Sequence, residues 1–168
     1  MFYFCEMQRK VLSKEQALQK ARHYCSYQER SHFEVREKLY SFGLHKNEVE
    51  EAIATLIEEN YLNEERYALQ FAGGKFRMKQ WGRVKIKYEL KQKRISEYCI
   101  RKAIDSIDEE QYLATLEKVA RKKWSSIRGV GVNQFVKMSK TTNYLLQHGF
   151  ESNLTKQIIQ KLKTKDED

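Results

Sequence analysis

Residues 39–44 have the sequence LYSFGL, and they begin a pattern that the chain uses three times. In each copy a leucine is followed at offsets of 4, 5, 14 and 17 by a turn residue and three apolar residues. The copies are Leu39, Gly43, Leu44, Ile53 and Leu56; Leu90, Arg94, Ile95, Ile104 and Ile107; and Leu145, Gly149, Phe150, Ile159 and Leu162. This recurrence predicts one structural unit repeated three times.

The offsets predict where helices end and begin. A core leucine followed by glycine at the fourth position and an apolar residue at the fifth is typical of a helix C-terminus. The later apolar pair is spaced by three residues, which places it on one face of a new helix. A further helix is expected before each pair, because Ala17, Leu18 and Ala21 recur 51 residues later as Ala68, Leu69 and Ala72. Each unit should therefore contain three helices.

The predicted fold is all-α, with about nine helices in three tandem three-helix repeats that form an elongated, curved stack. Three pairs have or approach the capping-box spacing of a helix start: Ser13 with Gln16, Ser31 with Glu34, and Asp108 with Gln111. The chain lacks proline, and its one strand-like aromatic run is MFYF at residues 1–4. We expect an N-terminal extension at 1–12, repeats at 13–60, 61–107 and 108–163, and a frayed tail at 164–168.

Two glycine pairs mark expected irregularities. Alignment of the copies places about ten extra residues in the third repeat, and they are expected to loop out within residues 125–134, where Gly129 and Gly131 lie. Gly73 and Gly74 fall inside the first helix of the second repeat, where two glycines cost on the order of 2 kcal/mol of helix propensity. A kink or an early helix end is expected there, with close backbone packing as the alternative.

Composition restricts the class of protein. The 40% hydrophobic content suffices for packed cores, so the 33% charged content does not indicate disorder. Cys5, Cys25 and Cys99 form no C-x-x-C pair and are odd in number, which predicts buried thiols in a reducing compartment. The N-terminal apolar run stops at Cys5, too short for a secretory signal or a membrane span. A cytoplasmic protein that does not cross a membrane is therefore expected.

Positive charge is concentrated in the middle of the chain. Residues 75–102 contain eleven basic and two acidic side chains, whereas the rest of the sequence contains 21 of each. On a helix, Arg83, Lys87, Lys91 and Arg94 fall within an arc of about 80°, between apolar residues on both sides. This ridge is predicted to dock phosphates or an acidic protein groove; the alternative is a solvated helix face whose lysine stems cover apolar surface.

The predicted contact residues for a filament or a nucleic acid are Lys75, Arg77, Lys79, Arg83, Lys85, Lys87, Lys91 and Arg94. Three aromatic residues lie among them, namely Phe76, Trp81 and Tyr88. They could stack on bases, but core packing is the expected role of at least two.

The sequence lacks the patterns that catalysis or cofactor binding requires. None of the four histidines, His23, His32, His45 and His148, has the spacing of a zinc ligand, so surface or capping roles are expected. Acidic doublets such as Glu64-Glu65 and Glu109-Glu110 point about 100° apart on a helix and do not converge. Gly129-Val130-Gly131 is too short for a phosphate loop and is expected to be a flexible inter-helix loop. No catalytic, metal or cofactor site is predicted.

Four segments together resemble the RecX family of recombination regulators, over roughly residues 12–162. They are Arg30-Ser31 through Leu39 to Gly43-Leu44; Tyr61-Leu62-Asn63-Glu64 with Phe71; Gly82-Arg83 to Glu89-Leu90; and Gly149-Phe150. The resemblance implies a bacterial, non-enzymatic protein of three tandem three-helix units that binds the RecA recombinase filament along its groove. It also implies restraint of ATP hydrolysis and strand exchange. The chain departs from the family at Arg94, where a turn glycine is usual, and at Gly73-Gly74.

Two hypotheses follow for function. The first is a regulator that lies along a recombinase–DNA filament, with the basic ridge against phosphates or an acidic subunit surface. The second is a stand-alone helical protein that binds nucleic acid without a recombinase, because a basic helical stack binds single- or double-stranded DNA backbones whatever its partner. No membrane partner is expected in either case, and a monomer is the simplest expectation.

Overall fold

The computed structural model of the chain describes residues 12–165, and within that range it contains nine α-helices and no strand. The helices are α1 (Lys14–Tyr27), α2 (His32–Ser41), α3 (Lys46–Glu58), α4 (Glu64–Lys79), α5 (Arg83–Gln92), α6 (Glu97–Asp105), α7 (Glu109–Ser126), α8 (Gln134–Gln147) and α9 (Ser152–Lys165). The strand-like run at 1–4, Cys5, all but the last residue of the expected extension, and residues 166–168 of the tail lie outside the described residues.

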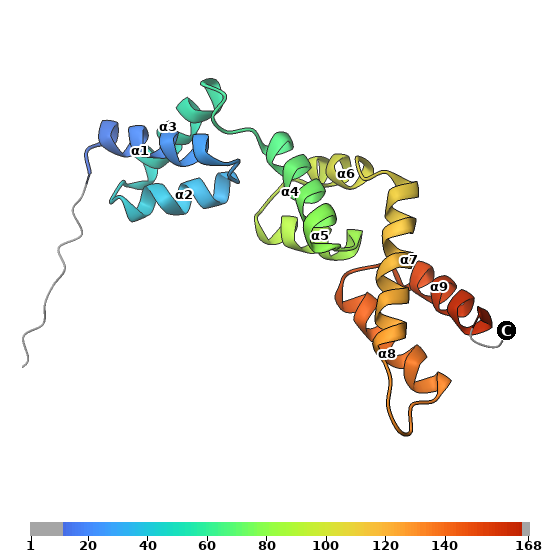
Figure 1. The fold of residues 1–168 in the computed structure, drawn as a ribbon. Helices are drawn as coiled ribbons and strands as arrows, with labels where there is room; N and C mark the ends of the chain where they lie inside the picture. The colour runs from blue at the N-terminus through green and yellow to red at the C-terminus, as the bar shows by residue number, and fades with distance from the viewer. Residues whose placement is uncertain (1–11, 166–168) are drawn as a thin grey trace, which may run out of the picture. The chain divides into compact units, whose positions relative to one another are not determined.

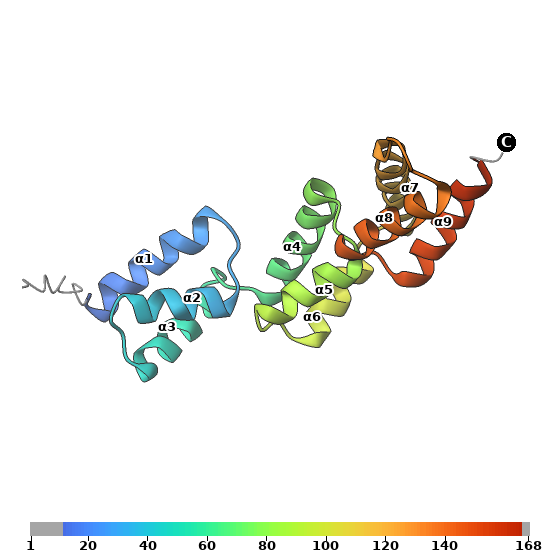
Figure 2. The ribbon, with the colours of Figure 1, turned by 90° about the horizontal axis from the view of Figure 1, so that it is seen from below.

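The helices form three consecutive groups, which we call repeat 1 (α1–α3), repeat 2 (α4–α6) and repeat 3 (α7–α9) (Figure 1). In repeat 1, α1 packs against α2 and α3, which also pack against each other (Figure 2). In repeat 2, α5 packs against α6, and in repeat 3 the three helices all pack together. The prediction of an all-α fold with three tandem three-helix repeats is confirmed.

The recurring pattern forms the core of each repeat. Leu39, Leu90 and Leu145 are completely buried, and every other apolar position of the pattern is buried except Ile104, which is half-buried. In repeat 1 the amide of Gly43 donates to Tyr40 O at 2.9 Å and that of Leu44 to Leu39 O at 3.4 Å. These are the two bonds of a Schellman helix end, in which the apolar residue folds back onto the helix. Repeat 3 has the same pair of bonds at Gly149 and Phe150.

The turn in repeat 2 keeps this backbone conformation without a glycine. Arg94 has φ of 57°, and its counterparts Gly43 and Gly149 have φ of 90° and 85°. An L side chain in the left-handed region costs on the order of 1 kcal/mol or more. The Arg94 guanidinium lies 4.6 Å from the centre of the Phe33 ring, a cation–π contact that offsets part of this cost.

Short polar side chains cap the helix starts. The capping boxes predicted at Ser13 with Gln16 and Ser31 with Glu34 are both present. Asp108 accepts a hydrogen bond from the amide of Gln111 at 2.8 Å. Further caps that the spacing does not predict include Asn63 on α4, Ser96 on α6 and Asn133 on α8.

The expected helix end at Gly73 and Gly74 is wrong, because α4 continues through both residues to Lys79. Ala68, Ala72 and Phe76 are buried at four-residue intervals on one face, so packing holds the helix across the glycines. Close backbone packing does not explain the pair either. A Cβ at Gly74 would meet nothing within 4 Å, and the atoms nearest to one at Gly73 belong to the flexible end of the Arg77 side chain.

The extra residues of repeat 3 are distributed more widely than expected. The loop from residue 127 to 133 is four residues longer than the loop from 80 to 82 in repeat 2. The other additions lengthen the helices, since α7 exceeds α4 by two residues and α8 exceeds α5 by four. Trp124, buried near the end of α7, helps explain why that helix extends further.

The chain divides into two compact units that do not coincide with the repeats. The first contains the described chain through Tyr67 together with Lys93–Ile95, and the second contains Ala68–Gln92 and everything from Ser96 onward. Within the first unit, Arg66 pairs with Glu29 and Lys93 pairs with Glu34, each at 2.6 Å. The second unit therefore combines repeat 3 with most of repeat 2.

Two further predictions concern the cysteines and the membrane. Cys25 and Cys99 are buried, as expected, and burial raises the pKa of the Cys25 thiol to about 11. Between residues 12 and 165, none of the helices combines the length and the apolar character that crossing a membrane would need.

Candidate interaction surfaces

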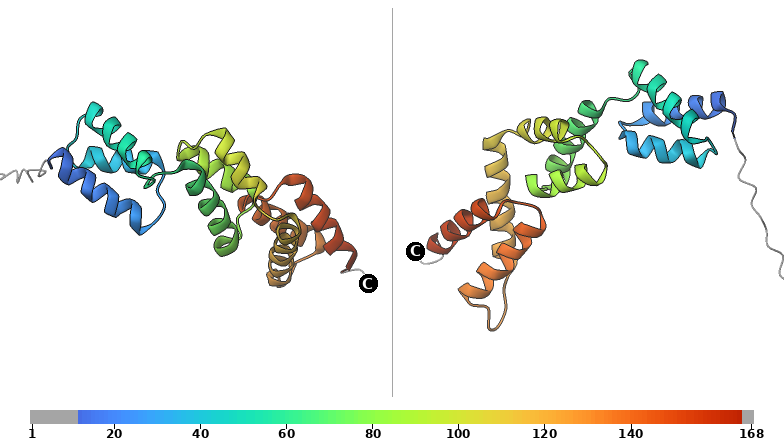
Figure 3. Two further views of the ribbon diagram at one scale, coloured as in Figure 1. Left: turned by 90° about the horizontal axis from the view of Figure 1, so that it is seen from above. Right: turned by 180° about the vertical axis from the view of Figure 1, so that it is seen from behind.

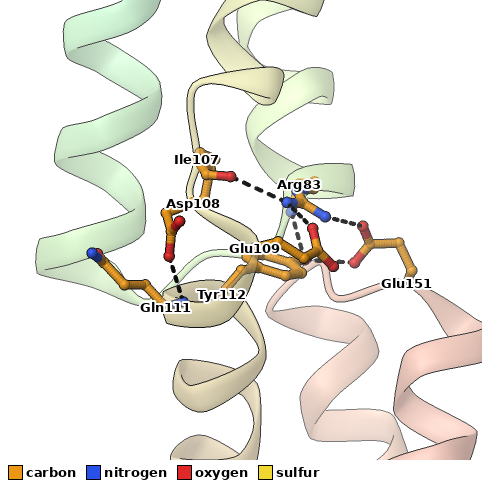
Figure 4. Close-up of polar contacts among 7 residues, drawn as sticks. All are labelled: Arg83, Ile107, Asp108, Glu109, Gln111, Tyr112 and Glu151. Carbon is orange, nitrogen blue, oxygen red and sulfur yellow. Dashed lines mark hydrogen bonds and ion pairs between the residues drawn. The ribbon is translucent and has the colours of Figure 1, made fainter.

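Arg83, the first residue of α5, is surrounded by partners from repeat 3 and from the turn before α7 (Figure 4). Its Nη2 donates to Glu109 Oε2 at 2.6 Å and to the carbonyl oxygen of Ile107 at 3.3 Å, and its Nη1 lies 4.0 Å from Glu151 Oε1. The guanidinium also stacks over the Tyr112 ring, 4.1 Å from its centre. Only 20% of the Arg83 side chain is exposed. We call Arg83, Glu109, Tyr112 and Glu151 the Arg83 network.

Tyr112 is the centre of this network and is completely buried. Its hydroxyl donates to Glu151 Oε2 at 2.5 Å and accepts from the backbone amide of Arg83 at 3.0 Å. Burial and the hydrogen bond to Glu151 raise the pKa of Tyr112. Its ring lies between Phe76 and Phe150, with centre-to-centre distances of 5.8 and 5.6 Å. The hydroxyl therefore remains protonated near neutral pH and links α5, α7 and the turn before α9.

Beside the network, two backbone segments meet at glycines. The amide of Gly82 donates to His148 O at 2.8 Å, and that of Val84 donates to Gly149 O at 3.0 Å. A Cβ at Gly82 would lie 2.1 Å from the carbonyl oxygen of Gly149. Only glycine fits at this distance, so the start of α5 is fixed against repeat 3.

Two of the predicted contact lysines lie against aromatic rings. Lys85 Nζ is 4.6 Å and Lys75 Nζ is 5.1 Å from the centre of the half-buried Trp81 ring. Lys75 Nζ also lies 5.2 Å from the ring centre of Phe71. Lys85 additionally approaches the carbonyl oxygen of Gln147 at 3.5 Å. These contacts leave both lysines half-buried.

Lys87 and Lys91 lie along the exposed face of α5 and share one carboxylate. Their Nζ atoms lie 2.8 and 3.3 Å from the two oxygens of Glu97, and about half of each of the three side chains is exposed. Hydrogen bonds from Lys87 and then Lys91 hold the pKa of Glu97 below its usual value. Because solvent screens such pairs, each bond is weak and an incoming phosphate could replace it.

Arg77 and Lys79 are exposed in the last turn of α4. Arg77 borders an open groove of about 360 Å³ together with Lys118 of α7, and Phe76 lies at the same groove. The remaining residues that line it are Gln80, Gln111, Ala114 and Thr115. This groove brings one cation from each of the two repeats of the second unit to a single surface of mixed polar and apolar character.

The structure thus separates the eight predicted contact residues. Arg77, Lys79, Lys87 and Lys91 are exposed, whereas Lys75, Arg83 and Lys85 are half-buried against internal partners. Arg94 is also exposed, but it belongs to the first compact unit. Among the neighbouring aromatic residues, Phe76 is buried and Trp81 is half-buried, while Tyr88 is 60% exposed. Core packing is therefore seen for Phe76, whereas Trp81 is only partly buried and Tyr88 is exposed.

The charge balance outside residues 75–102 hides a second basic region. The sequence from Lys118 to Phe150 contains seven lysines and arginines and not one acidic residue. The seven are Lys118, Arg121, Lys122, Lys123, Arg128, Lys137 and Lys140. Acidic residues elsewhere compensate for them in the total, so only a count in short windows would have revealed the region. We call residues 75–102 and 118–150 the first and the second basic stretch.

The histidines occupy the ordinary positions that were expected. His23 and His45 are exposed, and His45 directly precedes α3. The Nδ1 atom of His148 lies 3.0 Å from the carbonyl oxygen of Tyr144 in the last turn of α8. His32 is half-buried, which lowers its pKa. Within residues 12–165 no three histidine, cysteine or acidic side chains cluster in a way that could hold a metal ion.

Family models match the chain in three places. They describe the first, second and third three-helix domains of RecX and match residues 17–56, 63–104 and 109–159. These ranges correspond to repeats 1, 2 and 3.

Individual relatives agree with the family models. A regulatory protein RecX of Clostridium perfringens (strain 13 / Type A) is 32% identical over 77% of this chain, and one of Lactobacillus gasseri is 31% identical over 95%. The chain spans about 60% of the length of these curated relatives. The crystal structure of RecX from Lactobacillus salivarius superposes with a TM-score of 0.79 at 26% identity, covering 90% of this chain and 97% of that one.

Proposed function

Because the chain belongs to the RecX family, we propose that it is a regulatory protein that binds the filament of a RecA-type recombinase on DNA. In this proposal it restrains ATP hydrolysis and strand exchange by the filament. The observation that carries the proposal is the placement of exposed cations on α4 and α5 of a RecX-type repeat array. A polyanionic partner such as a DNA-bound filament matches this surface.

The contact residues fall into two groups within this proposal. Arg77, Lys79, Lys87 and Lys91 would meet phosphates or carboxylates directly, because their side chains are exposed. Lys75, Lys85 and Arg94 would contribute positive potential from positions beside aromatic rings. Arg83 would act as a positioning residue, since its ion pair with Glu109 holds the start of α5.

A titration of single-strand-DNA-dependent ATP hydrolysis by a bacterial RecA tests the proposal. We expect the protein to inhibit hydrolysis at low stoichiometry, and the double variant Arg77→Glu/Lys79→Glu to lose most of this inhibition. Reversing the charge of Arg83 as well would mix a loss of stability with a loss of binding, because a glutamate there would face Glu109 and Glu151 and disturb the fold. Both residues of the double variant are exposed, so circular dichroism should show unchanged helicity.

The matched control is Lys156→Glu/Lys161→Glu on α9, which makes the same change in net charge at two exposed lysines outside the basic stretches. We expect it to retain inhibition. Equal losses in both double variants would mean that net charge alone matters and that no particular surface is used. Absence of inhibition by the wild-type protein, with filaments shown to be present, would contradict the proposal.

The stand-alone nucleic-acid-binding protein is the second candidate, and it is favoured by the density of positive charge in the two basic stretches. Affinities for bare DNA and for the filament, measured at the same salt concentration, separate the two candidates. Binding to bare DNA that is as tight as binding to the filament would support the second candidate. Much weaker binding to bare DNA would support a contact centred on the recombinase.

A further inference from the structure

The loop between α7 and α8 exposes apolar side chains in the second basic stretch. Figure 3 shows this loop at the end of the α7–α8 pair. Val130, between Gly129 and Gly131, is fully exposed, and Phe135 in the first turn of α8 is 76% exposed. A single exposed apolar side chain is common on protein surfaces, but apolar side chains rimmed by polar residues are typical of an interaction site.

The loop lies at the free end of repeat 3. The opposite end of α8 is fixed at the Gly149 turn, and the 14 residues of the helix separate the two ends by about 20 Å. Lys137 Nζ of α8 lies 5.6 Å from the centre of the Trp124 ring of α7, so the two helix ends that flank the loop are in contact. The exposed apolar residues are therefore held in place by the packed ends of α7 and α8.

The charges around the loop are of one sign. Arg128 lies in the loop and its Nε donates to the carbonyl oxygen of Ser125 at 3.0 Å, which fixes the stem of its side chain near the end of α7. Lys122 and Lys140 are exposed on the flanking helices, and within the described residues no hydrogen bond or ion pair occupies them. The stretch itself contains no acidic residue, and Glu117, which directly precedes it, pairs with Arg121 rather than with these cations.

We propose that this end of repeat 3 is a contact for single-stranded nucleic acid, in which Phe135 stacks on an unpaired base and the surrounding cations meet the phosphates. An unpaired strand matches the surface because it combines a negative charge at each nucleotide with a flat apolar ring that no partner strand covers. A duplex offers the charges but keeps its bases stacked. An acidic peptide offers the charges without an obligatory ring for Phe135.

This inference deepens the proposed function, because a recombinase filament assembles on single-stranded DNA, but the contact itself requires no recombinase. It is tested with the full chain and a fluorescein-labelled dT oligonucleotide of about twenty nucleotides, by anisotropy at several salt concentrations. We expect Phe135→Ala to weaken binding by about fivefold or more and to leave the slope of log affinity against log salt unchanged. Phe135→Tyr should retain binding, whereas Phe135→Leu should not.

A second variant tests the cations. Arg128→Ser should reduce the salt slope by about 0.7, the value for one phosphate contact on a single strand. The matched aromatic control is Tyr27→Ala, because Tyr27 ends α1 in repeat 1 and is 82% exposed. We expect this control to bind the oligonucleotide as the wild-type protein does. Since Phe135 is exposed, unfolding temperatures of all these variants should agree with the wild type.

Several outcomes would overturn the inference. One is normal oligonucleotide binding by Phe135→Ala, and another is an equal loss of affinity for a blunt duplex of the same length. If Phe135→Ala binds the oligonucleotide normally but no longer inhibits ATP hydrolysis, the surface docks a protein, and the proposed function stands without this inference. If the wild-type protein binds no bare strand, the inference fails, while ATP hydrolysis still decides the proposed function.

Discussion

The first and the second basic stretch contain comparable excesses of positive charge, but the structure uses them differently. In the first, Arg83 pairs with Glu109, and Lys87 and Lys91 share Glu97. In the second, no acidic residue interrupts the sequence, and Lys122 and Lys140 remain exposed beside an exposed apolar loop. A cluster of basic residues can therefore either stabilise the fold or form an exposed binding surface, and the partners of each residue show which role it has.

The difference follows from what each stretch contacts in the second compact unit. The first stretch includes the start of α5, where Gly82 and Arg83 meet repeat 3, so part of its charge stabilises that junction. The second stretch includes the far end of α7 and the loop, where Arg128 bonds within its own repeat, to the carbonyl oxygen of Ser125. Substitutions at the junction itself, such as at Gly82 or Arg83, should therefore affect folding, whereas those at the exposed cations of the first stretch and at the loop of the second should affect binding.

The largest expected effect is at Gly82. Gly82→Ala would place a Cβ 2.1 Å from the carbonyl oxygen of Gly149, and neither backbone segment can move without losing the hydrogen bonds between them. We expect a loss of more than about 4 kcal/mol in the free energy of unfolding, measured by urea titration.

The matched control is Gly74→Ala on α4, one residue before the first stretch, where the new Cβ would have open space around it. It should increase stability by about 0.5–1 kcal/mol, because alanine favours the helix. Equal effects of the two substitutions would show that the close approach of Gly82 and Gly149 is absent in solution.

The next largest effect is expected at Arg83. Arg83→Glu would place a carboxylate beside Glu109 and Glu151 and over the Tyr112 ring, so we expect a loss of about 3 kcal/mol or more. Lys87→Glu, one turn further along α5, makes the same change at a side chain that is about half exposed. The control should change stability by less than about 1 kcal/mol. Comparable losses would contradict the division of the first stretch into internal and exposed cations.

A smaller effect is expected when the Tyr112 hydroxyl is removed. Tyr112→Phe deletes the donor to Glu151 and the acceptor for the Arg83 amide but keeps the ring between Phe76 and Phe150. We expect a loss of about 1–2 kcal/mol, seen as a lower urea midpoint with an unchanged slope. Tyr144→Phe removes a hydroxyl from a tyrosine of repeat 3 that is only half-buried, and it should have little effect. Wild-type stability of Tyr112→Phe would mean that the Arg83 network is held by its charges alone.

The sequence predicts the helices well because the causes are local. A leucine, a turn residue and an apolar residue at fixed offsets determine a helix end, and the Schellman bonds at Gly43 and Gly149 follow from that spacing. The prediction of a helix end at Gly73 and Gly74 failed because helix propensity is a small contribution to stability. The buried face formed by Ala68, Ala72 and Phe76 outweighs it.

The candidate surfaces could be predicted only in part, because the missing information is non-local. The sequence identifies Arg83 as a cation of α5, but its partner Glu109 lies 26 residues away and becomes a neighbour only after repeats 2 and 3 pack. Helical geometry predicts that Lys87 and Lys91 lie on one face of α5. It does not predict that Glu97 of α6 pairs with both of them. The exposure of Phe135 likewise depends on how the loop returns to α8.

The smallest expected effect concerns Glu97, whose carboxylate forms ion pairs with two exposed lysines of the first stretch. Glu97→Gln removes this competition with phosphates, so we expect the affinity for bare DNA to rise about twofold, with little change in stability. Glu58→Gln on α3 makes the same change in net charge at an exposed residue of repeat 1 and should raise the affinity less. A larger rise for Glu97→Gln, lost when Lys87 and Lys91 are also replaced by serine, would show that these lysines meet DNA once Glu97 releases them. Equal rises in the two single variants would show that the first stretch acts through its long-range potential, and would leave direct contact to the second stretch.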